Sequence, residues 1–157
     1  MKLIAHRGNI DGKNPDKENH PDYVKAAIEA GFEAEIDIWL VDDEFWLGHD
    51  EPQYNIGGPQ SDMWFSFLFK YNKCLWIHCK NLKALGKLFN YKDLNVFWHD
   101  TDAVVLTSQR FLWTFPNEPL LPNSICVMPE RGINGDLNKC YGLCSDFPLK
   151  YKDGIYK

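Results

Sequence analysis

Residues 33–40 read EAEIDIWL, and this stretch decides the fold because its polar and apolar residues alternate with the period of two that predicts a β-strand. Glu33, Glu35 and Asp37 share one face of the strand, whereas Ala34 and the two isoleucines share the other face. Three acids in line repel one another unless solvent, protons or a cation intervene. The strand is therefore both a sheet-forming element and a candidate functional site.

Strands and helices alternate on both sides of this stretch. Before it, an apolar run predicts a strand that ends at His6, and Pro21 and Asp22 begin a helix that Gly31 ends. The elements predicted around it are, in chain order, strand 2–5, helix 21–30, strand 45–47, helix 62–71, strand 75–80 and helix 82–90. The residues expected to face inward from the last of these helices are Leu82, Leu85, Leu88 and Phe89.

The chain after Asn90 is poor in predicted helices. Short strand-like runs occur at residues 95–99, 103–107, 125–129 and 142–145, with a possible further one near 113–115. The connections between these runs are too short to hold many full helices. The order strand, helix, strand in the first half favours parallel pairing in an α/β fold, which places polar residues at the carboxyl ends of strands.

Length and composition describe one folded domain. The chain has 157 residues, close to the usual length of one domain, and no linker-like stretch divides it, so residues 1–157 are expected to form a single domain. Hydrophobic residues make up 45% and charged residues 25%, as in ordinary globular proteins. The net charge of −5 argues against a general nucleic-acid binder or a binder of anionic membranes, because both need clustered positive charge.

Targeting signals and cysteine content bear on the cellular location of the protein and on the redox state of its thiols. No window approaches the roughly 18 consecutive apolar residues of a membrane span, and the N-terminal residues lack the apolar stretch of a signal peptide. We therefore expect a soluble, cytoplasmic protein without stable membrane association. The five cysteines are an odd number, so they cannot all pair within one chain, and reduced thiols are expected.

Several short motifs follow one another in the first 50 residues. They are His6-Arg7-Gly8, then Glu18-Asn19, then Ala30-Gly31 leading to Glu35-Ile36-Asp37, and finally Gly48-His49-Asp50. In order and spacing they resemble the glycerophosphodiester phosphodiesterase family, part of the wider group of phosphatidylinositol-phospholipase-C-like phosphodiesterases. Weaker similarities follow at residues 77–80 and 142–148.

The resemblance implies a TIM-type (β/α) barrel. Such barrels typically have about 250 residues, so the 157 residues here predict a reduced barrel in which several outer helices are shortened or missing. An open or incomplete barrel is the alternative.

The resemblance also implies a metal site and an acid–base pair. Glu35 and Asp37 match the family's metal ligands, and two carboxylates suit a hard divalent cation such as Mg²⁺ or Ca²⁺. His6 and His49 match the family's catalytic histidines, which cleave a phosphodiester by moving one proton from the nucleophile and another to the leaving alkoxide. A solvated acidic edge and an ordinary loop histidine are the alternatives for each taken alone.

Two cations and a third histidine complete the expected site. Arg7 offers a bidentate fork and Lys80 a point charge for phosphate oxygens, although each could instead form a surface salt bridge. His78 stands where the family usually has a glutamate ligand. An imidazole can also bind a metal but favours borderline ions such as Mn²⁺ or Zn²⁺, so metal identity stays open, as does a buried histidine that binds nothing.

The sequence as a whole predicts a metal-dependent phosphoric diester hydrolase. It would act on small glycerophosphodiester-like substrates of lipid metabolism, with His6 and His49 as general acid and base. The alternatives are a sphingomyelinase-D-like phosphodiesterase and a reduced barrel that binds phosphate without turnover. The sequence does not define the substrate's head group or an oligomeric state.

Overall fold

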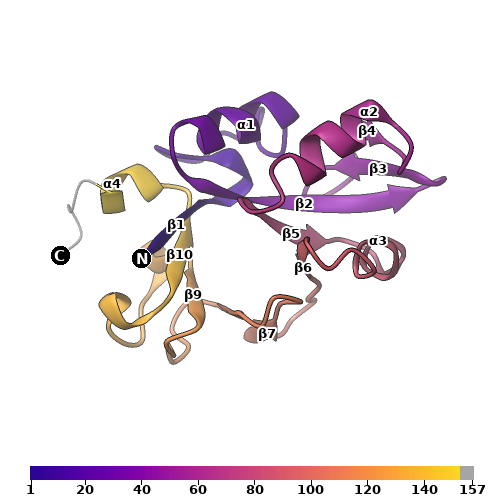
Figure 1. The fold of residues 1–157 in the computed structure, drawn as a ribbon. Helices are drawn as coiled ribbons and strands as arrows, with labels where there is room; N and C mark the ends of the chain where they lie inside the picture. Colours follow the sequence, from indigo (N-terminus) through magenta and orange to yellow (C-terminus); the bar gives the residue numbers. More distant parts are fainter. Residues whose placement is uncertain (153–157) are drawn as a thin grey trace.

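The computed structural model describes residues 1–152, which fold around one curved mixed sheet (Figure 1). Its strands are β1 (Lys2–Ala5), β2 (Glu33–Val41), β3 (Glu44–Leu47), β4 (Tyr54–Gly57), β5 (Leu75–Cys79), β6 (Asn95–Phe97), β7 (Val104–Leu106), β8 (Leu112–Thr114), β9 (Ser124–Val127) and β10 (Gly142–Ser145). Its α-helices are α1 (Pro21–Glu29), α2 (Asp62–Trp64), α3 (Leu82–Leu88) and α4 (Pro148–Lys152). A π-helical turn, Phe65–Phe69, continues α2.

The sheet is mostly parallel around its centre. The first strand, β1, pairs in parallel with β2 on one side and with β10 on the other, and the parallel pairing continues through β9 to β8. On the other side β2 pairs in parallel with β5, and β5 with β6. The far end of β2 instead joins β3 and β4 as an antiparallel extension, and β7 pairs antiparallel with β8. The carboxyl ends of β1, β2, β5, β6, β8, β9 and β10 therefore gather at one pole of the sheet.

The predicted reduced TIM-type barrel is wrong. The sheet curves into a half-barrel, and the chain between α3 and α4 contains no α-helix among the described residues. Within this region β7 forms an antiparallel hairpin with β8, whereas β8, β9 and β10 pair in parallel through connections without an α-helix. The open, incomplete barrel stated as the alternative is the closer description.

Two neighbouring residues, Ser108 and Gln109, link the two edges that a closed barrel would pair, and the Gln109 amide donates to the Lys92 carbonyl oxygen at 2.7 Å. Ser108 donates its backbone N–H to the Val96 carbonyl oxygen, and its hydroxyl accepts the Val96 N–H, both at 2.9 Å. Among the described residues, no ladder pairs β6 with β7. The seam stays open on its outer side, where Leu106 is 64% exposed.

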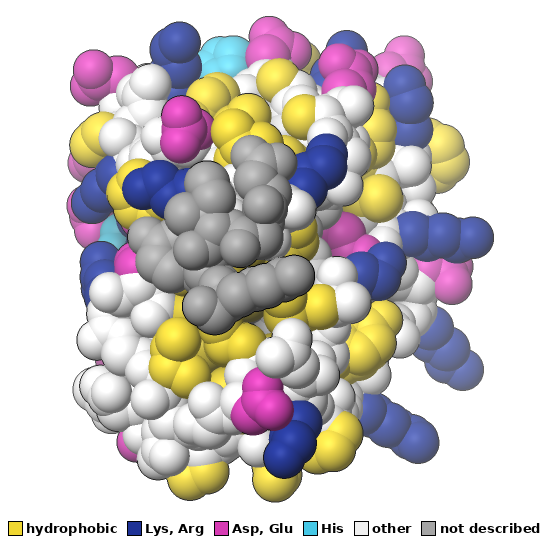
Figure 2. Space-filling view, turned by 90° about the vertical axis from the view of Figure 1, so that its left-hand side faces the viewer, with side chains coloured by type: hydrophobic (Ala, Val, Ile, Leu, Met, Phe, Trp, Pro, Cys, Tyr) yellow, Lys and Arg dark blue, Asp and Glu magenta, His cyan; other side chains and the backbone are white. Residues whose placement is uncertain are grey.

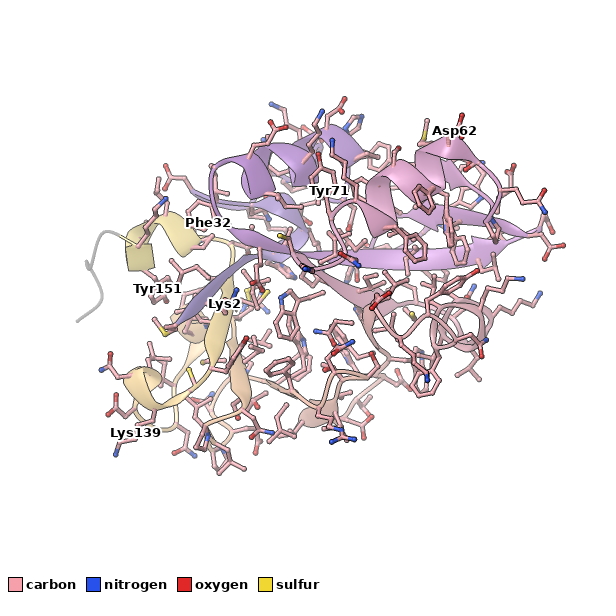
Figure 3. The ribbon with its side chains drawn as sticks, in the orientation of Figure 1. Lys2, Phe32, Asp62, Tyr71, Lys139 and Tyr151 are labelled. Carbon is pink, nitrogen blue, oxygen red and sulfur yellow. The ribbon has the colours of Figure 1, made fainter. Side chains whose placement is uncertain are left out.

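The core is divided between the outside and the inside of the curved sheet. The larger cluster packs α1, α2 and α3 against β2, β3 and β5, and Phe45, Ile38 and Leu88 are fully buried in it. Side chains also fill the inside of the curve (Figure 3). A second cluster lies there and includes Trp76 and Trp113. No described helix has both the length and the apolar character needed to cross a bilayer.

Most sequence-predicted elements are confirmed, with one clear error at α3. Asn81 caps α3 as expected, since its side chain accepts the Ala84 N–H. The inward stripe is wrong at its ends, because Leu82 is 66% and Phe89 63% exposed. No outer helix follows β6 to cover these two side chains. The strand β4 was not predicted from the sequence.

Charges are mixed on the face that carries α4 and the start of the chain. Lys and Arg side chains lie between Asp and Glu side chains and apolar groups on this face (Figure 2). A continuous positive surface of the kind that holds a nucleic-acid backbone is not present there.

Candidate functional site

The sequence-predicted site residues come together at the pole formed by the carboxyl ends of the parallel strands. His6 and Arg7 follow β1, Glu35 and Asp37 lie on β2, and the others come from β5 and the end of β3. They border one cavity of about 470 Å³, whose lining includes His6, Arg7, Glu35, His49, His78 and Lys80. Asp37 is fully buried beneath it. The structure thus brings all seven predicted residues into one place.

Two glycines shape the turns that present the histidines. Gly8 has φ +87° and lies so close to Tyr23 and to the backbone of Val24 that a Cβ would clash. Gly48 has φ +148°, and a Cβ there would clash with the Glu51 carbonyl oxygen. Both positions need glycine, because its backbone adopts these conformations without steric cost.

Asp37 is the buried centre of the charged network. Its Oδ2 lies 3.0 Å from Arg7 Nε and accepts a hydrogen bond of 2.9 Å from the Asn19 amide. Its Oδ1 lies 2.9 Å from His78 Nδ1 and 3.7 Å from Lys80 Nζ. Burial alone would raise the pKa of Asp37, but the His78 hydrogen bond and the charges of Arg7 and Lys80 outweigh it and hold the pKa well below its usual range.

The pKa of Glu35, one pleat earlier on β2, is shifted in the opposite direction. Glu35 accepts a hydrogen bond of 3.1 Å from the Arg7 backbone N–H and is 3% exposed. Burial raises the pKa of Glu35, and the neighbouring charge of Asp37 raises it further. A carboxylate in this position gains from a cation placed beside it.

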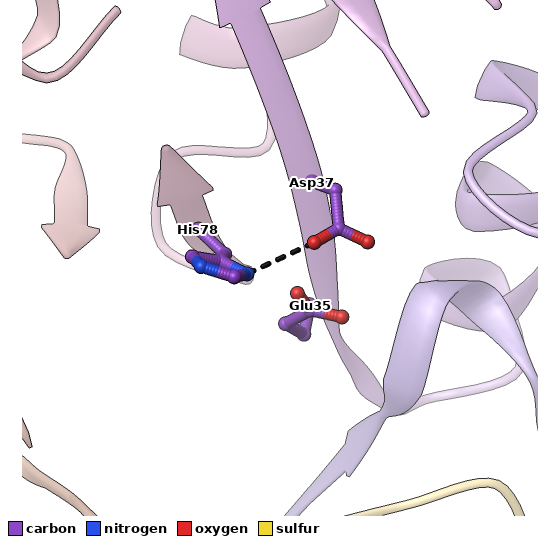
Figure 4. A group of neighbouring side chains, drawn as sticks. All are labelled: Glu35, Asp37 and His78. Atoms are coloured by element: carbon purple, nitrogen blue, oxygen red, sulfur yellow. Dashed lines mark hydrogen bonds and ion pairs between the residues drawn. The ribbon is translucent and has the colours of Figure 1, made fainter. Parts of the chain in front are cut away.

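Glu35, Asp37 and His78 have the arrangement of a metal site (Figure 4). One ligand atom from each lies within 4.8 Å of the others, and all three residues are buried. The His78 nitrogen on the side of the carboxylates is Nδ1, 2.9 Å from Asp37 Oδ1, so a metal ion shared by the three residues would replace this hydrogen bond. The mixed oxygen and nitrogen set fits Mn²⁺ or Zn²⁺ and, through its carboxylates, Mg²⁺.

Arg7 is held more firmly than the sequence indicated. Besides its ion pair with Asp37, its Nη1 donates to Glu18 Oε2 at 3.0 Å. Asn9 in turn donates to Glu18 Oε1 at 3.0 Å. The guanidinium therefore has two carboxylate partners, of which Glu18 comes from the loop before α1, and Lys80 is the less constrained cation.

His6 has a partner that the sequence did not assign. Its Nδ1 lies 2.8 Å from Asp146 Oδ1, which also accepts a 2.8 Å hydrogen bond from Asn9. Burial would raise the pKa of Asp146, but the hydrogen bond from His6 outweighs burial and lowers it. The Asp146 carboxylate fixes the orientation of the His6 ring. The one sequence signal for Asp146 is its position directly after the predicted strand 142–145.

His49 lies at the mouth of the cavity. Its side chain is 38% exposed, and its Nδ1 lies 2.7 Å from Asp50 Oδ1. Burial lowers the pKa of His49, and the positive charges of Arg7 and Lys80 lower it further, against the opposing effect of Asp37. The neutral imidazole is therefore favoured at neutral pH, and it can accept a proton.

The other side of the cavity is aromatic and contains a histidine without an assigned role. His99 stacks on His78 with 4.3 Å between ring centroids and 6° between planes, and it meets Phe115 edge-on. Burial, reinforced by the charge of His78, lowers the pKa of His99 to about 4. Parallel stacked rings direct their lone pairs into separate planes, so His99 does not share a metal ion with His78.

The comparisons with known proteins add no relative. No family model, no curated protein and no solved structure matches this chain.

Proposed function

We propose that this protein is a metal-dependent phosphoric diester hydrolase acting on small glycerophosphodiester-like substrates. One observation supports this most strongly: the cavity combines a carboxylate-held histidine, a second histidine, a three-residue metal site and a cation. Hydrolysis of a phosphodiester needs these groups, because charge must be neutralised on the phosphate while protons move on both sides of it. A structural ion-pair network has no need of two separate histidines at the mouth.

Lys80 and Arg7 supply the positive charge for the phosphate. Lys80 lies 3.7 Å from Asp37 and lines the cavity, so its ammonium can reach a phosphate oxygen while staying near its carboxylate. Arg7 is bound to Glu18 and Asp37 and contributes a fixed charge to the lining of the cavity. A divalent cation held by Glu35, Asp37 and His78 would add Lewis-acid stabilisation of the phosphoryl oxygens.

The two histidines have different roles in the proposed reaction. His49, with its lowered pKa, accepts the proton of the attacking hydroxyl. His6, whose ring Asp146 orients, donates a proton to the leaving alkoxide. The nucleophile is either water or a neighbouring hydroxyl of the substrate, and the second course gives a cyclic phosphate that water then opens.

A phosphate-binding protein without turnover is the second candidate. It is favoured by the charge balance around Asp37, whose two oxygens already meet Arg7, Asn19, His78 and Lys80. A cation is not needed to neutralise this carboxylate. Turnover separates the two candidates.

The test is hydrolysis of a panel of glycerophosphodiesters and one chromogenic diester, with Mg²⁺, Ca²⁺, Mn²⁺, Zn²⁺ or chelator. We expect turnover that needs a cation and that falls about 10²–10⁴-fold in His49→Ala, the usual contribution of one proton-transfer group. The exposed Asp62→Ala, on α2 away from the cavity, is the matched control. Phosphate binding without turnover under every condition, in a folded protein, would support the second candidate.

A further inference from the structure

A second cavity lies at the opposite pole of the parallel strands. It has a volume of about 340 Å³, within the usual range for small-molecule sites. Lys2, Glu33, Leu75 and Asn95 border it, and each begins one of the parallel strands whose carboxyl ends carry the candidate active site. Lys2 is labelled at the start of β1 in Figure 3. The aromatic cluster inside the curved sheet separates the two cavities.

The floor of this cavity contains a buried hydrogen-bond acceptor without a partner. Asn95 is 7% exposed, and its Oδ1 has no hydrogen-bond partner in the part of the chain that the structure describes. The other polar groups of the floor are satisfied: Glu33 accepts the Trp76 indole N–H at 2.7 Å and pairs with Lys2 at 2.5 Å. An orphaned buried acceptor costs free energy unless something donates to it. A ligand with an N–H or O–H group at its inner end would supply that donor.

The walls of the cavity are aromatic. Phe111 and Tyr141 lie with their ring centroids 4.4 Å apart, and Phe111 also contacts Trp76 at 5.2 Å. Tyr141 is 38% exposed, so part of its ring faces solvent at the entrance. Flat aromatic faces beside a buried amide suit a planar ring with polar edges.

The rim of the cavity is positive. Lys73 and Lys92 border it, and neither forms an ion pair with another described residue. Lys2 is balanced by Glu33, so the remaining charges are these two ammonium groups and the carboxylate of Asp93. The excess favours an anionic group at the outer end of a ligand.

We propose that this cavity is a second ligand site and that it binds a nucleoside monophosphate. The base stacks against the aromatic wall and donates its edge N–H to Asn95, while the phosphate reaches Lys73 and Lys92. An asparagine amide pairs naturally with the edge of a base, adenine above all. The site is independent of the proposed hydrolase activity, since it uses none of the residues of that cavity.

Calorimetric titration with AMP, GMP, CMP and UMP tests the proposal, in the presence of chelator and at low salt. Ribose 5-phosphate and inorganic phosphate serve as ligands that lack the base. We expect at least one nucleoside monophosphate to bind with one-to-one stoichiometry, about tenfold or more tighter than either base-free ligand, the factor that corresponds to one good hydrogen bond. No binding of any of the four nucleotides, or equal affinity for inorganic phosphate, would overturn it.

Variants then show which of the two cavities binds the nucleotide. Asn95→Leu removes the acceptor at similar volume and should weaken nucleotide binding about tenfold. The double variant Lys73→Ala/Lys92→Ala changes only exposed side chains and should also weaken it, which keeps the test valid if Asn95→Leu misfolds. Lys80→Ala, in the other cavity, should leave the affinity unchanged. Affinity lost in Lys80→Ala and kept in the other two variants would place the nucleotide at the wrong pole and contradict the proposal.

Discussion

The inner face of the curved sheet differs between two regions, the strands β2 and β5 on one side and the strands β6 to β10 on the other. On β2 and β5 the inner face carries Glu35, Asp37 and His78, and the outer face is covered by helices. On β6 to β10 the inner face is mostly aromatic or aliphatic, and no α-helix stands between α3 and α4 in the described chain. Charges can be buried on the first side because counter-charges lie within 4 Å of them. The second side supplies a water-poor wall that strengthens those interactions.

The largest expected effect comes from removing the buried charge of Asp37, at the centre of the charged side. Asp37→Asn should lower the free energy of unfolding by about 3–5 kcal/mol at pH 7, because it removes the buried carboxylate that Arg7 and Lys80 share and leaves Arg7 with Glu18 alone. Urea unfolding measures the change. Asp50→Asn, whose side chain is 93% exposed, is the control and should change stability by less than about 0.5 kcal/mol.

Replacing one leucine on each side compares the outer face that helices cover with the outer face that they leave uncovered. Leu88→Ala, in α3 over the first side, should cost about 2–5 kcal/mol because Leu88 is fully buried. Leu106→Ala, on β7 of the second side, should stay within about 0.5 kcal/mol because Leu106 is 64% exposed. Equal losses from both replacements, in the same unfolding assay, would mean that the second outer face is covered in solution.

Glu35→Gln should act in the direction opposite to Asp37→Asn. The raised pKa of Glu35 means that its ionised form is unfavourable in the folded state. The penalty is absent below the ordinary Glu range, where the group is neutral in both states, and it grows as pH rises. We therefore expect a gain of about 0.5–2 kcal/mol at pH 7 that disappears in acid, at the cost of metal binding. A variant less stable than wild type at pH 7 would be inconsistent with this interpretation.

The smallest effect concerns the pH dependence of catalysis. If His49 accepts a proton, kcat/KM falls as pH drops through the pKa of His49, which lies below its ordinary value of 6.5. Lys80→Ala removes one of the charges that lower this pKa, so the acidic limb should move to higher pH by a fraction of a unit. The position of the limb, measured apart from the reduced rate, checks the assignment. An unmoved limb would point to another group as the base.

The sequence predicted the first half of the fold far better than the second. Alternation in residues 33–40 defined β2 because its buried and site-facing residues differ in type. The weak, short runs after Asn90 gave strand positions but no direction, so the reversal of β7 could not be read from them. Pairing partners depend on the connections and on tertiary packing, which local patterns do not record.

The candidate site likewise combines residues that the sequence predicted with contacts that it could not predict. His6, Arg7, Glu35, Asp37 and His49 lie in compact motifs, and the structure gathers them at one pole. Asp146 is 140 residues from His6 in the chain, so only the parallel pairing of β1 with β10 brings the two together. The stacking of His99 on His78 likewise depends on the neighbouring strands β5 and β6.

The contact between His6 and Asp146 joins the two sides of the sheet, and a double-mutant cycle on kcat tests most directly whether they form one catalytic site. Because residues that act as a unit are strongly non-additive, His6→Ala/Asp146→Asn should be no slower than His6→Ala alone, within about twofold. Asp146→Asn alone should still be slow, because its carboxylate orients the ring of His6. Independent effects that multiply in the double variant, or an Asp146→Asn enzyme as fast as wild type, would contradict a site built from both sides.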